Sequence, residues 1–234
     1  MGLLGGLRKE VYEANMELFK RGLVLYNFGN VSGIDREQGL IAIKPSGVPY
    51  ADLTPDKIVV VDLNCKVIEG GTPSSDTKTH VVLYRHFPGI GGVAHTHSTY
   101  ATAWAQAIRP IPCLGTTHAD HLPAEVPCTD TMSDKQIQGD YETETGLQII
   151  NRFGSLSHTD IPMVLVASHG PFTWGDTPAK AVYNGVILEE IAKMASITHN
   201  LNPVEKNIAQ ELINRHYQRK HGANATYGQK GNRF

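Results

Sequence analysis

The sequence predicts an α/β protein, a single layered domain with a central β-sheet flanked by helices. Short apolar runs typical of buried strands recur along the 234 residues. Between them lie longer segments whose apolar residues follow helical spacing. Long helices that flank several strands are typical of a layered α/β domain. No repeat, low-complexity tract or linker interrupts this pattern, so we expect residues 1–234 to form one domain.

The composition excludes several classes of function. Hydrophobic residues make up 41% of the chain, which is enough for one sizeable core. The formal net charge is −2 and the charges are scattered, so we expect no binding of nucleic acid or of a membrane surface. The apolar start of the chain is too short for a signal peptide. Three cysteines without ligand-like pairing predict reduced thiols and a cytoplasmic protein.

The first half of the chain alternates helices and strands. Four apolar residues between Leu7 and Leu18 lie at helical spacing, and Gly22 follows as a stop signal. Turn residues separate the next apolar runs, and Pro88-Gly89 ends the second helix. The elements predicted after the first helix are strands at Leu40–Lys44 and Ile58–Asp62, a helix from Asp76 to about Phe87, and a strand at Ile90–Ala94.

The second half begins with a short helix at Ser98–Ala107 and an extended stretch at Pro110–Leu114. Gly139 predicts a break in the helical segment that follows. Pro178 suits the first turn of a long helix. The remaining predicted elements are helices within Asp134–Phe153, a strand at Met163–Ala167, a helix from Thr177 to about Thr198, a helix from Pro203 to His221, and a polar tail at about 222–234.

Two histidines, one residue apart, follow the predicted strand Ile90–Ala94. Because side chains alternate along a strand, His95 and His97 point to the same side. His169 stands at the end of another buried strand. Three imidazoles suit zinc or a similar divalent ion and leave one position for a substrate. The alternative is that a hydrogen bond holds each histidine in the core or at the surface, and the spacing leaves both interpretations open.

Three short segments are candidate binding sites for an anion. Backbone N–H groups at helix starts and in glycine turns bind phosphate oxygens, and a lysine adds charge. None of the three is a Walker loop or a dinucleotide fingerprint, and each alone is also typical of an ordinary turn. The segments are Gly29-Asn30, Lys44-Pro45-Ser46-Gly47 and Ser74-Ser75.

Three further residues each have two interpretations. Asp76 precedes a helix, where capping explains an aspartate fully, and a carboxylate beside a metal is the alternative. Asp120 lies in the polar cluster Thr116–His121 and is either a solvated loop residue or a general base. Tyr227 lies in a polar, glycine-containing tail, and the composition of such a tail predicts no function for a tyrosine by itself.

Taken in order, a series of segments resembles the class II aldolase/adducin family. Each segment is a weak signal, but the ordered set covers nearly the whole chain and is specific. The resemblance implies a class II aldolase-like fold. It also implies an enzyme, because adducin-type interaction modules lack the three histidines. The segments are residues 29–32, 43–48, 73–77, 91–98, 115–120, 168–172 and 216–222, followed by 227–229.

Residue by residue, the resemblance implies a zinc site and a substrate pocket. His95, His97 and His169 would bind one zinc ion per subunit, for which manganese or cobalt can substitute. Asp76 would lie at the metal and contact the substrate. The residues implied for substrate and phosphate are Gly29, Asn30, Lys44, Ser46, Gly47, Ser74, Ser75 and Asp76.

The resemblance also implies a partner, because members of this family form four-fold homotetramers with active sites at subunit interfaces. Asp120 and Tyr227 would transfer protons at the metal site of the neighbouring subunit, with His216 in support. The tail at about 222–234 would then be functional rather than an ordinary chain end.

The reaction implied is epimerisation of L-ribulose 5-phosphate, a phosphorylated ketopentose, to D-xylulose 5-phosphate in arabinose or ascorbate catabolism. Carbon 4 is not adjacent to the carbonyl, so deprotonation cannot invert it. Zinc-assisted cleavage of the C3–C4 bond, rotation of the aldehyde and re-addition can. The alternative is a family aldolase acting on fuculose or rhamnulose phosphate, against which Asp76 argues, because these aldolases carry glutamate at that position. A non-catalytic adducin-like module is a third interpretation.

Overall fold

The computed structural model describes residues 4–203, 206–222 and 225. Its centre is a seven-stranded sheet in the order β4-β3-β2-β1-β5-β7-β6, with every neighbouring pair antiparallel. The strands are β1 (Asn30–Asp35), β2 (Leu40–Ile43), β3 (Val59–Asp62), β4 (Val67–Glu69), β5 (Gly92–His95), β6 (Met163–Val166) and β7 (Gly170–Gly175).

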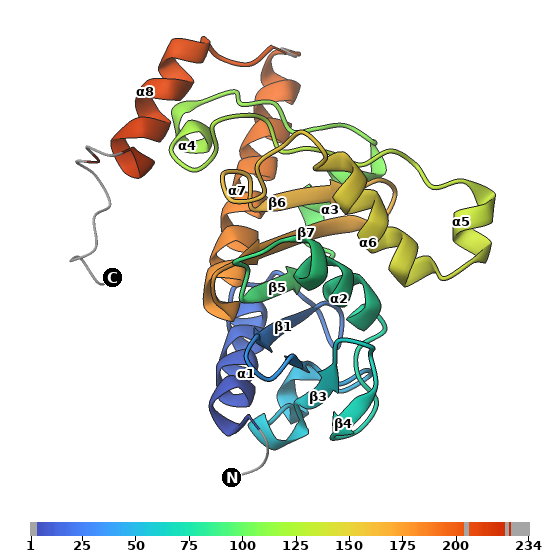
Figure 1. The fold of residues 1–234 in the computed structure, drawn as a ribbon. Helices are drawn as coiled ribbons and strands as arrows, with labels where there is room; N and C mark the ends of the chain where they lie inside the picture. Colours follow the sequence, from blue (N-terminus) through green and yellow to red (C-terminus); the bar gives the residue numbers. More distant parts are fainter. Residues whose placement is uncertain (1–3, 204–205, 223–224, 226–234) are drawn as a thin grey trace.

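Helices cover both faces of this sheet (Figure 1). Helices α1 (Gly5–Lys20) and α7 (Pro178–Leu201) pack on one face, and α2 (Thr77–His86) and α6 (Tyr141–Arg152) pack together on the other. The other helices are α3 (Thr99–Gln106), α4 (Thr116–Ala119), α5 (Asp134–Gln138), α8 (Gln210–His221) and the short 3-10 turns η1 (Tyr50–Asp52) and η2 (Pro55–Lys57).

The alternation of side chains along the central strands divides the core. On β5, Ala94 packs toward α1 and α7, whereas Val93 joins the larger cluster under α2 and α6. On β7, Phe172 and Trp174 enter that larger cluster. None of the helices in the described part of the chain combines the length and apolar character that crossing a membrane requires.

The predicted layered α/β fold is confirmed, as is the helical break at Gly139 between α5 and α6. The sequence pattern does not predict two of the central strands, β1 and β7. β1 carries Gly33, where a Cβ would come within 2.8 Å of Leu7 and Pro178. Because α1 and α7 pack so closely on this strand, a glycine stands where an apolar side chain would otherwise indicate a buried strand. β7 begins with Gly170-Pro171, which the sequence pattern assigns to a turn.

One boundary is wrong. The sequence predicts the last helix from Pro203 to His221, but α8 begins only at Gln210. Just before α8, the Ile208 N–H donates to the Cys113 carbonyl in a distant loop at 2.9 Å, so this tertiary contact replaces the helical bond that local propensity favours. The three cysteines are free thiols, as the sequence predicts.

Candidate active site

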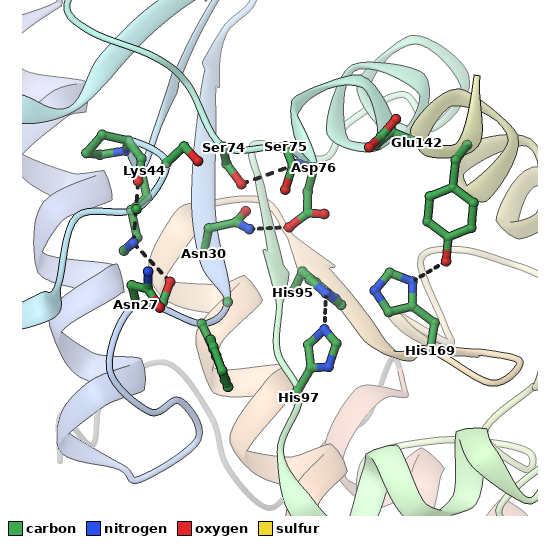
Figure 2. Close-up of a pocket in the computed structure, with 16 residues that line it drawn as sticks. Asn27, Asn30, Lys44, Ser74, Ser75, Asp76, His95, His97, Glu142 and His169 are labelled. Atoms are coloured by element: carbon green, nitrogen blue, oxygen red, sulfur yellow. Dashed lines mark hydrogen bonds between the residues drawn. The ribbon is translucent and has the colours of Figure 1, made fainter. Parts of the chain in front are cut away.

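The sheet topology brings three histidines together. His95 ends β5, His97 follows it, and His169 lies in the turn that leads into β7, the neighbour of β5. The Nε2 atoms of His95 and His97 are 3.0 Å apart. One ligand atom from each of the three histidines lies within 4.8 Å of the others. Figure 2 shows the three rings on one side of the pocket.

The surroundings orient His95 and favour the neutral form of His169. The Nδ1 of His95 lies 2.9 Å from the Pro171 carbonyl and must donate to it, which leaves Nε2 directed at the other two rings. The Phe172 ring stacks on His95 at 4.1 Å. Burial, aided by the neighbouring histidines, lowers the pKa of His169 to about 4. Neutral nitrogen donors in this arrangement fit a zinc ion with one position left open.

Asp76 occupies the N-cap position of α2, but its carboxylate makes no capping bond there. The capping interpretation of this residue is therefore wrong. The side chain turns into the pocket instead, where Asn30 Nδ2 donates to Asp76 Oδ2 at 2.6 Å (Figure 2). Burial opposes ionisation of the carboxyl, but His95, His80 and Asn30 together outweigh it and lower its pKa. An anionic carboxylate thus faces the histidine cluster.

Two adjacent turns form the opposite wall of the pocket. The Ser74 N–H donates to the Lys44 carbonyl at 3.1 Å, and the Ser46 N–H donates to the Thr72 carbonyl at 3.0 Å. The cavity next to them has a volume of about 510 Å³. All the residues predicted for substrate and metal line this one cavity, namely Gly29, Asn30, Lys44, Ser46, Gly47, Ser74, Ser75, Asp76, His95, His97 and His169.

Gly29 is required where the chain enters this cavity. Its φ of +68° lies in the left-handed region, and a Cβ would stand 2.7 Å from the His95 carbonyl oxygen. Any larger residue would push the start of β1, where Asn30 lies, away from the end of β5, where His95 lies. Gly29 thus allows these two sides of the cavity to approach each other.

Lys44 is a buried cation on the wall formed by the two turns. Its Nζ contacts the carbonyl oxygens of Asn27 and Pro45 at 3.3 and 3.4 Å, and it lies 5.0 Å from the centre of the Tyr50 ring. Burial lowers the pKa of Lys44 to about 8. Carbonyl oxygens only partly compensate a buried charge, so the lysine favours an anion in the cavity.

No sequence pattern indicates the side of the cavity that α6 supplies. Tyr141 and Glu142, at the start of α6, line it, and the Tyr141 hydroxyl lies 3.5 Å from His169 Nδ1. Because α6 reaches the site only by packing on α2, the spacing of residues along the chain does not reveal this contact.

The proposed proton-transfer residues lie elsewhere. Asp120 follows α4, and His216 is on α8, which packs against α4. His216 Nδ1 and Asp120 Oδ1 are 2.9 Å apart, so these two predicted residues do meet. Neither lines the cavity with the histidines, and Figure 1 places α4 and α8 together near the C-terminal end of α7. Tyr227 lies outside the described residues.

Glu189 on α7 holds the helix that follows the two histidines of β5. Its two carboxylate oxygens accept hydrogen bonds from the backbone N–H groups of Tyr100 and Ala101 at 2.8 and 2.9 Å. These are otherwise unpaired donors of the first turn of α3. The position of His97, two residues before α3, thus depends on a side chain of α7.

We expect Glu189→Gln to lower the free energy of unfolding by about 1–2 kcal/mol, because a neutral amide accepts less strongly at a helix N-terminus. It should also weaken zinc affinity by loosening His97. Thermal unfolding and competitive zinc titration measure both effects, with exposed Glu190→Gln as the matched control. Equal behaviour of the two variants would contradict this role for Glu189.

The fold and the site define a class of protein. The model of the class II aldolase and adducin N-terminal domain matches residues 9–196, and the chain belongs to this family. A protein of Salmonella paratyphi C (strain RKS4594) named L-ribulose-5-phosphate 4-epimerase UlaF is 52% identical over 225 residues, which cover 96% of this chain and 99% of that protein. A protein of the same name from Salmonella choleraesuis (strain SC-B67) matches equally well.

Solved structures agree with this assignment of the fold. An L-fuculose 1-phosphate aldolase superposes with a TM-score of 0.77 at 25% identity, over 93% of this chain and 97% of that one.

Proposed function

We propose that this chain is a zinc-dependent L-ribulose-5-phosphate 4-epimerase that interconverts L-ribulose 5-phosphate and D-xylulose 5-phosphate. The observation that carries the proposal is the cavity, in which a three-histidine cluster and the Asp76 carboxylate face a two-turn anion site. The 52% identity to proteins named for this reaction supports the choice of substrate.

Inversion at C4 then proceeds by breaking and remaking the C3–C4 bond. The C4 hydroxyl loses its proton and becomes an aldehyde, and the bonding electrons pass to the ketone half as an enediolate. The phosphate on C5 stays with the aldehyde, so the halves are glycolaldehyde phosphate and the enediolate of dihydroxyacetone. The opposite assignment, dihydroxyacetone phosphate and glycolaldehyde, would require a phosphate on C1. Addition to the other aldehyde face gives the epimer.

The residues of this chain suit that sequence of events. A divalent ion held by His95, His97 and His169 would supply Lewis-acid stabilisation of the negative charge on the ketone half. The two turns and Lys44 would hold the phosphate, which belongs to the half that must rotate. A gripped phosphate lets the aldehyde turn without escaping, and this distinguishes an epimerase from an aldolase that releases its products.

Proton transfer requires groups on both faces of the aldehyde. We propose that Asp120 and Tyr227 supply them and that His216 supports Asp120. Asp120 and His216 do not line the cavity of their own chain, which supports the proposal that a neighbouring copy presents them. This favours a homotetramer with its active sites at the interfaces and assigns a function to the tail at about 222–234.

Lys44→Met should raise KM for L-ribulose 5-phosphate by about 10- to 100-fold and change kcat little, because it removes binding that ground and transition states share. Steady-state kinetics measure this, and exposed Lys66→Met serves as the charge-matched control. An unchanged KM would remove Lys44 from phosphate binding.

A chain that ends at residue 226 should keep its fold and its zinc but lose about 10²- to 10⁴-fold in kcat, the usual contribution of one general acid or base. Tyr227→Phe should reproduce most of that loss. Circular dichroism and metal analysis check the first expectation. An unchanged turnover in both variants would exclude the tail from the mechanism.

The choice between epimerase and aldolase is tested by offering L-ribulose 5-phosphate and L-fuculose 1-phosphate to the zinc-loaded protein in parallel. We expect the first to be epimerised without lasting fragments and the second to react far more slowly. Rapid release of fragments from the second substrate would favour the aldolase. A folded protein that binds no divalent ion would favour a non-catalytic module.

A further inference from the structure

The Asp120 carboxylate receives three hydrogen bonds from α8. His216 Nδ1 lies 2.9 Å from Oδ1, Arg219 Nε donates to Oδ1 at 3.1 Å, and Arg219 Nη2 donates to Oδ2 at 2.9 Å. A guanidinium that contacts both oxygens fixes the plane and rotation of a carboxylate, which a single donor does not. His216 must donate through Nδ1, because an ionised carboxylate only accepts.

The local backbone does not supply this orientation. Asp120 follows α4, which is only four residues long, so little helix precedes it. Besides Arg219, α8 places the positive charge of Lys220 near the Asp120 carboxylate. His221 Nε2, also on α8, lies 3.0 Å from the backbone carbonyl oxygen of Asp120. Next to Asp120, His121 faces Tyr183 and the charge of Lys180 from α7. Within the described part of the chain, the charged side chains that act on Asp120, Arg219 and Lys220, are both cations.

These surroundings determine the charge of Asp120. Partial burial opposes ionisation, but the bonds from Arg219 and His216 outweigh it, so the pKa of Asp120 is lowered. Of its two oxygens, Oδ1 accepts two of the three bonds and Oδ2 accepts one. Among the described residues, Oδ2 is therefore the oxygen with more capacity to accept a proton.

We propose that Arg219 is a positioning residue that aims the Asp120 carboxylate and leaves Oδ2 as the oxygen that accepts the proton of the substrate hydroxyl. The proton moves to Oδ2 when the C3–C4 bond breaks, and one of the two proton-transfer groups returns a proton when the bond reforms. The catalytic part of this inference rests on the proposed function. The part that concerns the charge and orientation of Asp120 does not.

Arg219→Met, Arg219→Lys and the control Arg215→Met, on the same helix one turn earlier and exposed, test the proposal in the full-length, zinc-loaded protein. We expect Arg219→Met to lower kcat by about 10- to 100-fold through misorientation while KM and zinc content stay unchanged. Arg219→Lys should restore only part of kcat, because an ammonium lacks the fork. Arg215→Met should behave as wild type.

The pH profile separates positioning from a structural tie between α4 and α8. Without Arg219 the pKa of Asp120 rises, so the carboxylate is protonated at higher pH. The acid limb of kcat/KM should therefore move up by about one pH unit in Arg219→Met. In Asp120→Asn, removal of Arg219 should add no further loss of kcat. An unchanged acid limb, or additive losses in the double variant, would overturn the proposal.

A measurement independent of activity keeps this test distinct from that of the proposed function. NMR titration of carboxyl-¹³C aspartate, with Asp120→Asn to assign the signal, should show a higher pKa of Asp120 in Arg219→Met than in wild type. An equal pKa in the two proteins would overturn the proposal whatever reaction the protein catalyses. Absence of epimerisation in wild type would refute only the proposed function.

Discussion

Replacing His97 by asparagine is expected to weaken zinc binding and epimerase activity by more than about 100-fold, since substitutions one shell further out from a metal already cost 10- to 100-fold. The amide cannot supply the imidazole nitrogen that lies 3.0 Å from His95 Nε2. Because His97 is exposed at the edge of the cavity rather than part of the core, the fold should survive.

Metal analysis, thermal unfolding and turnover measured on the same preparation separate these effects. His199→Asn, a histidine on α7 away from the cavity, is the matched control and should retain both zinc and activity. Full activity of His97→Asn after removal of divalent ions would refute the metal role of the cluster. A global loss of structure would show that the histidines hold the fold rather than an ion.

Asp120→Asn is expected to lower kcat by about 10²- to 10⁴-fold, because an amide cannot act as the general base that we propose for Asp120. Zinc content should stay at the wild-type level, since Asp120 does not line the cavity of its own chain. Steady-state kinetics and metal analysis provide these two values, and similar losses of zinc and activity would contradict the assignment.

The same variant tests whether a neighbouring copy supplies Asp120. Unfolding and refolding Asp120→Asn chains together with His97→Asn chains should restore activity, because mixed oligomers contain sites with an intact His97 from one chain and an intact Asp120 from the other. No recovery in oligomers shown to be mixed would place both residues in one chain's site. Refolding each variant alone is the control.

Local rules indicate only part of the candidate metal and substrate site, and the full set of residues comes from the resemblance to the family. His95 and His97 share a face by the period of a strand. Glycine turns and a lysine are local signals for an anion site. That His169 joins them depends on β7 pairing with β5, and no pattern in the chain reveals this strand order.

Other features depend on contacts between distant segments. Asp76 has the sequence signature of a helix cap, yet Asn30, 46 residues earlier, draws its carboxylate into the pocket. Tyr141 reaches the cavity only because α6 packs on α2. Arg219 contacts Asp120 across 99 residues of sequence. Burial and pairing at such positions are set by tertiary structure, which local propensity does not encode.

The most direct test of the account is to incubate the zinc-loaded protein with L-ribulose 5-phosphate in D₂O and to follow the products by NMR. We predict D-xylulose 5-phosphate that retains its hydrogen on C4, because the cleavage breaks a carbon–carbon bond and leaves the C4–H bond intact. Deuterium on C4, or glycolaldehyde phosphate and dihydroxyacetone as the lasting products, would contradict the account.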